Sequence, residues 1–268
     1  MRFRVLAIVL GALVVAGCTS NSGEPTSDCP APGTPSEVTV LAASSMKNVL
    51  TDVRDSFLAD HPCVTKLNIS FGSSGELAAQ IVNGAPADVF LAANEQTKNL
   101  VLGDESQGSE AVLIARNKMA ILVNTQSRFA GSIQKLGDLQ DVVNPEITVG
   151  VCVESAPCGA ILPTLLEADE LTVSDIADTT ASSVQDLVTK VTMGELDAGI
   201  VFGSDCTQAR RTKAAMCVDI NQDLPNPISS PLYVVALNSK TNTQDLAAYL
   251  ASNETKSLLQ KTYGFLAP

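Results

Sequence analysis

Tryptophan is absent from this chain of 268 residues, and tyrosine and histidine are scarce, with three copies and one. Without tryptophan, an aromatic platform that stacks on sugar rings is not expected. The single histidine, His61, precedes Pro62 at the predicted end of a helix, and no motif places it near a serine. We therefore predict His61 to be a surface residue and expect no Ser-His-Asp triad. A serine hydrolase remains the alternative of another functional class.

Basic residues are the minority among the charges. Lys and Arg number 17 against 29 Asp and Glu, which gives a formal net charge of −12. Removal of a leader that carries Arg2 and Arg4 leaves 15 basic against 29 acidic residues, a net charge of about −14. Such a surface repels nucleic acid and does not steer an anion from a distance. An anion site in this chain must therefore use local neutral donors.

The first 18 residues have the pattern of a bacterial secretion signal with a lipid anchor. Two arginines are followed by an apolar run, Val5–Val15, which is too short to cross a bilayer as a stable helix. The run ends at residues 15–18 (VAGC), which resemble a lipobox. We predict a signal peptide over 1–17, lipidation of Cys18, and a flexible tether over 18–36, which is rich in Ser, Thr, Pro and Gly. No later segment approaches the length of a membrane-spanning helix.

Six cysteines follow Cys18, an even number that suits an oxidising compartment. A zinc site would need clustered Cys-x-x-Cys pairs with histidines, and the sequence has neither. We therefore predict disulfides. Cys152 and Cys158 have a spacing that can close a small loop, Cys206 and Cys217 flank a basic segment, and Cys29 and Cys63 remain to pair with each other.

Strand-like and helix-like segments alternate along the chain, which predicts an α/β fold with mostly parallel strands. Strands are expected at 38–42, 69–71, 88–91, 111–114, 119–123, 147–151, 198–202 and 233–237. Helices are expected at 45–60, 74–82, 159–167, 184–191, 244–250 and 256–263. We expect two lobes, one formed by 37–118 with 229–268 and the other by 119–228.

A serine-containing turn stands out within residues 69–93, which predict a strand, a turn, a helix, a second turn and a strand. The first turn is Gly72-Ser73-Ser74-Gly75, and Ser73 with Glu76 has the spacing of a capping box. Two serines and several unpaired backbone N–H groups then meet at a helix N-terminus, which can hold a small anion. An ordinary helix cap is the alternative that these residues leave open. The turn lacks the Gly-x-Ser-x-Gly pattern of a hydrolase nucleophile.

Six short motifs follow one another along the chain. They are residues 40–46 (VLAASSM), 71–74 (FGSS), 80–90 (QIVNGAPADVF), 156–159 (APCG), 194–205 (GELDAGIVFGSD) and 263–265 (YGF). In this order they resemble the substrate-binding protein of bacterial molybdate ABC transporters, over about residues 37–268. The resemblance implies the fold of type II periplasmic binding proteins. That fold has two α/β lobes with mixed, mostly parallel sheets, joined by crossing strands, and the oxyanion lies in the cleft between them.

The resemblance also implies which residues bind the anion. Ser45 and Ser74 match the two family serines, each of which offers a hydroxyl and a backbone N–H at a helix start. Cys158 and Val184 match positions that offer only the backbone N–H. A site made of donors alone suits a tetrahedral dianion that carries no proton, such as molybdate or tungstate. The size of the site then separates these anions from the smaller sulfate.

One position departs from the family. Where the family commonly has a tyrosine whose hydroxyl reaches the anion, this chain has Phe202, whose ring cannot donate a hydrogen bond. Loss of a hydrogen bond to a charged group costs about 1.5–3 kcal/mol unless another group replaces it. Ser183 and Ser204 are the candidates for that replacement.

On this resemblance the protein is an extracytoplasmic lipoprotein that captures molybdate, and tungstate with it. Its expected partners are an ABC transporter permease, the ATPase of that transporter, and the membrane through the lipid anchor, whereas nucleic acid is excluded. We expect a monomer on the outer face of the cytoplasmic membrane, with no enzymatic activity and no cofactor. Molybdenum is the only metal expected, as part of the oxyanion. The same fold with sulfate or another oxyanion as its ligand remains the alternative.

Overall fold

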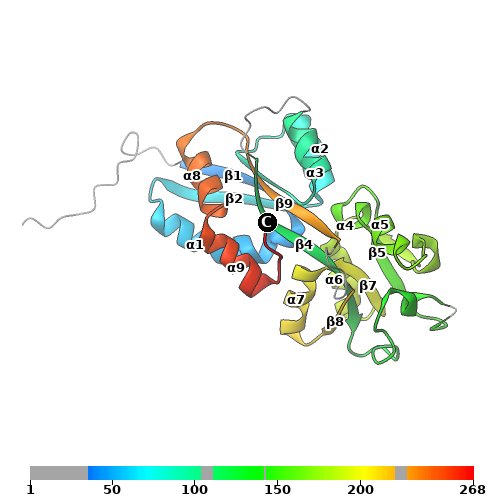
Figure 1. Cartoon of the computed structure of the whole chain (residues 1–268). Coiled ribbons are helices and arrows are strands. Elements are labelled where there is room, and N and C mark those ends of the chain that lie inside the picture. The colour runs from blue at the N-terminus through cyan, green and yellow to red at the C-terminus, as the bar shows by residue number, and fades with distance from the viewer. Residues whose placement is uncertain (1–35, 104–110, 142, 221–227) are drawn as a thin grey trace, which may run out of the picture.

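The computed structural model describes residues 36–268 apart from 104–110, 142 and 221–227 (Figure 1). The strands are β1 (Ser36–Ala43), β2 (Val64–Gly72), β3 (Val89–Ala92), β4 (Ala111–Asn124), β5 (Val149–Cys152), β6 (Thr179–Ala181), β7 (Ala198–Phe202), β8 (Ala215–Asp219) and β9 (Ser229–Ala236). The α-helices are α1 (Lys47–Asp60), α2 (Ser74–Val82), α3 (Glu95–Leu102), α4 (Pro157–Ala160), α5 (Leu162–Glu167), α6 (Val184–Met193), α7 (Gly203–Thr212), α8 (Thr241–Leu250) and α9 (Asn253–Tyr263). Short 3-10 turns are η1 (Ser44–Met46), η2 (Leu136–Leu139) and η3 (Val173–Asp175).

The predicted leader and anchor lie outside the described residues. This applies to the signal peptide 1–17, to Cys18, and to the whole of the tether except Ser36, which is the first residue of β1. In the described part of the chain, no helix has the length and apolar character needed to cross a membrane.

The strands form one curled sheet in the order β2-β1-β3-β9-β4-β7-β5-β6, with β8 paired to β4. Among the described residues, four strand pairs are parallel and four are antiparallel. The sheet is therefore mixed, and the prediction of mostly parallel strands is wrong. The reason is that β4 and β9 run antiparallel to each other and to the strands beside them. Figure 1 shows these two strands side by side in the middle of the molecule.

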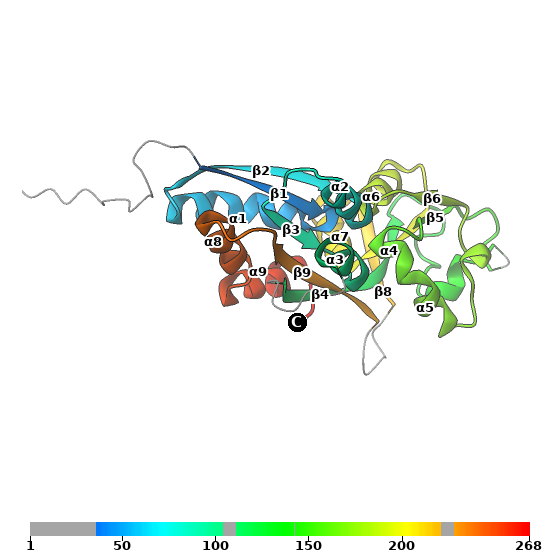
Figure 2. The same cartoon turned by 90° about the horizontal axis from the view of Figure 1, so that it is seen from above.

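The buried side chains fall into separate clusters on either side of the middle of β4. One cluster contains residues between 119 and 218, and we call this part lobe 2. The others contain residues from 38–115 and 232–265, and we call this part lobe 1. Figure 2 shows the two parts at opposite ends of the molecule. The boundaries at 118 and 228 that the sequence suggested stay a prediction.

Lobe 1 is a sheet covered on both faces because neighbouring residues of a strand point to opposite sides. In β1, Val40 and Ala42 pack into the cluster that contains residues of α1, α8 and α9. Leu41, between them, packs into the cluster that contains residues of α2. This arrangement leaves the carboxyl ends of β1 and β2, where η1 and α2 begin, facing lobe 2.

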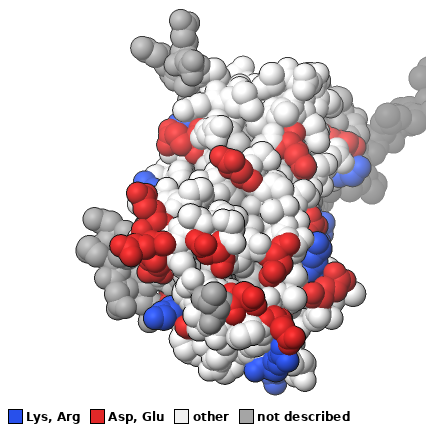
Figure 3. Space-filling model, turned by 90° about the vertical axis from the view of Figure 1, so that its right-hand side faces the viewer, with Lys and Arg blue, Asp and Glu red and all other residues white. Residues whose placement is uncertain are grey.

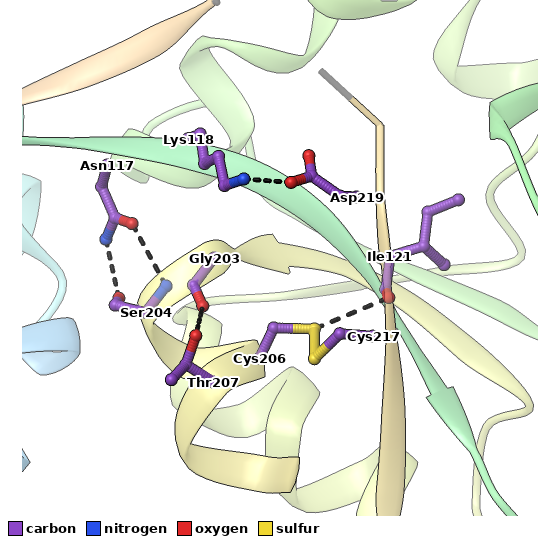
Figure 4. The surroundings of a disulfide bond; sticks show 9 residues. All are labelled: Asn117, Lys118, Ile121, Gly203, Ser204, Cys206, Thr207, Cys217 and Asp219. Atoms are coloured by element: carbon purple, nitrogen blue, oxygen red, sulfur yellow. Dashed lines mark hydrogen bonds and ion pairs between the residues drawn. A yellow bond between two sulfur atoms is a disulfide. The ribbon is translucent and has the colours of Figure 1, made fainter. Parts of the chain in front are cut away.

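β4 is one strand of 14 residues where two strands were predicted. Its first part pairs with β9, and its second part pairs with β7 and β8. The polar residues between the two apolar stretches continue the strand, because their side chains have partners on neighbouring elements. Asn117 donates from its side-chain nitrogen to Ser204 Oγ at 2.8 Å, and Lys118 forms an ion pair with Asp219 (Figure 4).

Two further helices and two strands were not predicted, namely α3, α7, β6 and β8. The sequence of α7, GSDCTQARRT, has too few apolar residues to give a helical period. The structure compensates because Cys206 and Ala209 are buried and a disulfide attaches the helix to β8.

Two of the predicted disulfides are present. Cys152–Cys158 joins the end of β5 to α4, with 5.7 Å between the Cα atoms. Cys206–Cys217 joins α7 to β8, with 5.6 Å between the Cα atoms (Figure 4). Cys63 also takes part in a disulfide, while Cys29, its predicted partner, lies outside the described residues.

His61, predicted to be a surface residue, is half-buried at the end of α1. It follows the last residue of α1, and its ring stacks on that of Phe57 with 4.2 Å between centroids. The Tyr249 ring is nearly perpendicular to the imidazole, with 6.1 Å between the ring centroids. The imidazole therefore packs against the end of α1, and it does not line the pocket that contains the predicted serines.

Candidate functional site

One pocket lies between the two lobes and brings all five predicted ligand positions together. Lobe 1 contributes Ala43, Ser44, Ser45, Gly72, Ser73, Ser74 and Ala93, and lobe 2 contributes Ala156, Pro157, Cys158, Ser183, Val184 and Phe202. The space between these walls, part of which is open to solvent, is about 240 Å³. Only a small part of this space is enclosed by the two walls. The pocket fits a small ligand.

Helix N-termini converge on this pocket because of how the strands are connected. β1 is followed directly by η1, β2 by α2 and β7 by α7, so each helix begins where a strand ends. α4 and α6 begin a few residues after β5 and β6. The first turn of each helix has N–H groups without partners in the helix, and it carries the positive end of the helix dipole. The geometry therefore favours an anion.

Ser74 is fully buried and is oriented by a hydrogen bond. Its Oγ accepts the backbone N–H of Ala93 at 3.1 Å, so the oxygen acts as an acceptor and the hydroxyl proton remains for another partner. Ser73 is the N-cap of α2, but its side chain makes no capping hydrogen bond. The predicted capping box between Ser73 and Glu76 is therefore wrong, and within the described residues the Ser73 hydroxyl has no partner.

Ser45 was predicted to begin an α-helix, but it lies in the 3-10 turn that precedes α1. It is the middle residue of the turn η1, and the α-helix itself begins at Lys47. Neither Ser45 nor its neighbour Ser44 uses its hydroxyl in a hydrogen bond to a described residue, and both are half-buried at the pocket. Two unoccupied hydroxyls and the N–H groups of the first turn thus lie together.

Cys158 presents a single free backbone N–H at the start of α4. Pro157 has no N–H to offer, and the N–H groups of Gly159 and Ala160 both donate to the carbonyl of Ala156 at 2.9 Å. The Cys158 N–H is left over in the first turn. The disulfide to Cys152 and the close packing of Gly159, whose Cβ would lie 2.0 Å from the carbonyl oxygen of Val153, hold this turn in place.

Val184 is the first residue of α6, and its side chain lies in the hydrophobic core. The side chain is 3 % exposed and packs in the cluster of lobe 2. Ser183 caps the helix by accepting the N–H of Asp186 at 3.3 Å, which leaves the Val184 N–H in the first turn without a partner. The Ser183 hydroxyl lines the pocket and can still donate.

Phe202 closes one side of the pocket with an apolar ring that is 2 % exposed. Of the two serines considered as replacements for a missing hydroxyl, Ser204 does not line the pocket, because it is paired with Asn117 (Figure 4). Ser183 does line it. Position therefore favours Ser183.

No acidic, basic or histidine side chain lines the pocket, so none of its walls titrates in the neutral range. The chain as a whole is acidic, and Figure 3 shows acidic side chains outnumbering basic ones on the face at the lobe 2 end. Within the described residues there is also no cluster of three His, Cys, Asp or Glu side chains that could hold a metal ion. Any anion held here is bound by neutral donors.

A family model described as bacterial extracellular solute-binding protein matches residues 38–266. The chain belongs to this family. Such proteins bind solutes for ABC transporters and are not enzymes, which confirms the prediction of a non-enzymatic function. The serine hydrolase alternative is therefore set aside.

Two relatives by sequence are informative. The molybdate-binding protein ModA of Mycobacterium tuberculosis is 32% identical over 200 residues, which cover 74% of this chain and 73% of ModA. A putative ABC transporter substrate-binding lipoprotein of Bacillus subtilis, YvgL, is 27% identical over 271 residues, or 98% of this chain and 96% of YvgL. The chain is thus similar to solute-binding proteins over most of its length, and one of these relatives is a lipoprotein.

Solved structures give the same fold. The periplasmic molybdate-binding protein of Azotobacter vinelandii has a TM-score of 0.68 and 22% identity, covering 86% of this chain and 99% of that one. The sulfate-binding protein SubI of Mycobacterium tuberculosis has a TM-score of 0.69 and 14% identity, covering 86% of each chain. The fold is that of type II periplasmic binding proteins, as the sequence motifs predicted.

Proposed function

We propose that this solute-binding protein captures molybdate, and tungstate with it, and delivers the anion to the permease of an ABC transporter. The observation that carries the proposal is the interlobe pocket, which is lined by serine hydroxyls and helix N-termini from both lobes and by no charged side chain. The likeness to ModA of Mycobacterium tuberculosis over three quarters of the chain supports molybdate as the ligand.

Each proposed ligand residue has a distinct role. Ser45 offers its hydroxyl and backbone N–H, and Ser74 offers the hydroxyl proton that its bond to Ala93 leaves free. Cys158 and Val184 offer backbone N–H groups, and Ser183 supplies the hydroxyl that Phe202 lacks. Helix N-termini carry a partial positive charge of about half a unit each, which offsets the dianion without a lysine or arginine.

The chemistry of the pocket distinguishes between oxyanions. At neutral pH molybdate carries no proton, whereas phosphate retains one that needs an acceptor, and no carboxylate lines this pocket. Sulfate also carries no proton but is smaller, so buried donors fixed at helix starts would be left at poor distances from it. Unsatisfied buried donors cost about 1–3 kcal/mol each, which favours the larger anion.

Sulfate is nevertheless the second candidate. The structure of the sulfate-binding protein SubI matches this chain as well as that of the molybdate-binding protein does, with TM-scores of 0.69 and 0.68. Likeness in fold at this level of identity does not choose between the two anions.

The experiment is a calorimetric titration of the mature protein, with its disulfides intact, with molybdate, tungstate, sulfate and phosphate under identical buffer conditions. We expect molybdate and tungstate to bind at least tenfold more tightly than sulfate, and phosphate to give no heat of binding. Tighter binding of sulfate would move the protein to the second candidate.

The membrane anchor is a separate proposal. A lipid on Cys18 would place the binding domain on the outer face of the cytoplasmic membrane, and the lipoprotein YvgL supports this. Labelling of growing cells with tritiated palmitate tests it. The wild-type protein should incorporate label and fractionate with membranes, whereas a Cys18→Ala variant should do neither.

A further inference from the structure

A contact between the lobes lies at the rim of the pocket. Gly75, the second residue of α2 in lobe 1, packs directly against the backbone of Ser155 in lobe 2. A Cβ atom built on Gly75 would lie 2.7 Å from the carbonyl oxygen of Ser155, a distance that real Cβ atoms essentially never show. The group in the way is backbone, so it cannot rotate aside as a flexible side chain would.

The conformation of Gly75 does not explain why glycine is present. Gly75 is not among the glycines with positive φ, and it lies in the first turn of a helix, where any residue fits. Alanine would in fact suit the helix better by up to about 1 kcal/mol. The close approach to lobe 2 is therefore what the missing side chain permits.

The position of this contact links it to the pocket. Ser73 and Ser74, just before Gly75, line the pocket from lobe 1, and Ala156 and Pro157, just after Ser155, line it from lobe 2. Ser74 is fully buried, whereas Ser155 is exposed. The contact between Gly75 and Ser155 therefore lies at the outer edge of the pocket, where the donor groups of lobe 1 meet those of lobe 2.

The lobe 2 side of the contact is held firmly. The disulfide Cys152–Cys158 encloses the loop that contains Ser155. Within this loop the N–H of Val153 donates to Ala181 at 2.9 Å, and that of Ala156 donates to Val153 at 3.0 Å. A side chain at residue 75 could not be accommodated by movement of this loop alone, so the lobes themselves would have to separate.

We propose that Gly75 is a positioning residue for lobe closure, and that its lack of a side chain lets α2 seat against the Ser155 carbonyl so that both sets of donors reach one anion. The inference rests on the proposed function. Ordinary carbon–oxygen contact begins near 3.4 Å, so an added methyl group displaces the lobes by about 0.7 Å at this point. Hydrogen bonds occupy a window of roughly 2.7–3.2 Å, and such a displacement takes donors of one lobe out of it.

The test compares Gly75→Ala with the wild type and with Gly131→Ala as a matched control. Gly131 also has no positive φ, and a Cβ there meets nothing within 4 Å. In solute-binding proteins the lobes close around the ligand, so the clash acts only in the closed state. We expect Gly75→Ala to weaken molybdate binding at least tenfold, mainly through faster dissociation measured by stopped flow, whereas Gly131→Ala leaves it unchanged. The compaction that small-angle X-ray scattering detects on adding molybdate should be smaller in Gly75→Ala.

A second readout separates closure from folding. The melting temperature of the anion-free Gly75→Ala protein should equal or exceed that of the wild type, because the helix gains a better helix former. A clear drop in that melting temperature, or a molybdate affinity equal to that of the wild type, would overturn the inference. If the wild type binds and Gly75→Ala binds equally well, only this inference fails. If the wild type binds none of the four anions, the proposed function and this inference fail together.

Discussion

Asp205, in the first turn of α7, is a buried carboxyl with no compensating charge in the described part of the chain, and its replacement by asparagine should stabilise the protein at alkaline pH. Its side chain is 8 % exposed, and Oδ2 has no hydrogen-bond partner among the described residues. Burial raises the pKa of this carboxyl to about 7, and only a hydrogen bond from its own backbone N–H opposes the shift. The folded protein therefore favours the protonated, neutral acid.

The magnitude follows from linkage between protonation and folding. In the unfolded chain the carboxyl ionises near pH 3.8, whereas in the folded chain it ionises near 7. Below about pH 4 both states are protonated and there is no penalty. As the pH rises from 4 to 7, the unfolded state loses its proton first and folding becomes less favourable, and above 7 the penalty is complete. Three pKa units correspond to about 4 kcal/mol as an upper limit.

Urea unfolding of the wild type and of Asp205→Asn at pH 5, 6, 7 and 8 measures this effect. The difference in unfolding free energy should grow by up to about 1.4 kcal/mol per pH unit and level off above pH 7. Asp169→Asn, at an exposed position, serves as the control and should change stability by less than about 0.5 kcal/mol at every pH. The reasoning is refuted if Asp205→Asn gives the same difference at pH 5 and pH 8, or destabilises the protein at pH 8.

The other predictions concern the pocket. Ser45→Ala and Ser74→Ala should each weaken molybdate binding at least tenfold by calorimetry. Only Ser74→Ala should also lower the melting temperature, because it leaves the buried N–H of Ala93 unpaired. A variant that binds molybdate as tightly as the wild type would show that its serine serves the fold alone. Phe202→Tyr should tighten binding if the absent hydroxyl limits affinity, and no gain would mean that Ser183 already replaces it. Double serine variants of Cys152–Cys158 and of Cys206–Cys217 should each lose about 2–3 kcal/mol in urea unfolding. Only the first variant should weaken molybdate binding, and equal affinities would separate that disulfide from the site.

Those parts of the fold that depend on local sequence could be predicted. The turn at Ser73 and Ser74 lies between an apolar strand and an apolar helical face, and α2 begins within it as expected. β4 could not be predicted as one strand, because Asn117 and Lys118 look like a turn until their partners Ser204 and Asp219 are brought close by the fold. These partners lie about 90 to 100 residues away, beyond the reach of any local pattern.

Some residues of the motifs that identify the family stabilise the fold and do not contact the pocket. Asp88, within residues 80–90, accepts the backbone N–H of Thr39 at 2.8 Å and is bonded by the side chains of Asn238 and Lys240. It fastens the end of the motif to β1 and to the segment after β9, away from the pocket. A motif therefore identifies a family without separating residues that hold the ligand from residues that hold the lobe together.

The two features that the sequence hid most completely are Gly75 and Asp205, because local rules explain Gly75 as part of a turn and Asp205 as a favourable helix start. An acid in the first turn of a helix normally gains about 0.3–1 kcal/mol from the helix dipole. Burial shifts the pKa of Asp205 by about three units, worth about 4 kcal/mol, so burial outweighs the dipole and the acid is neutral below pH 7. α7 begins beside Phe202 at the pocket. While Asp205 is protonated, its carboxyl does not oppose the positive end of this helix, which favours an anion in the pocket.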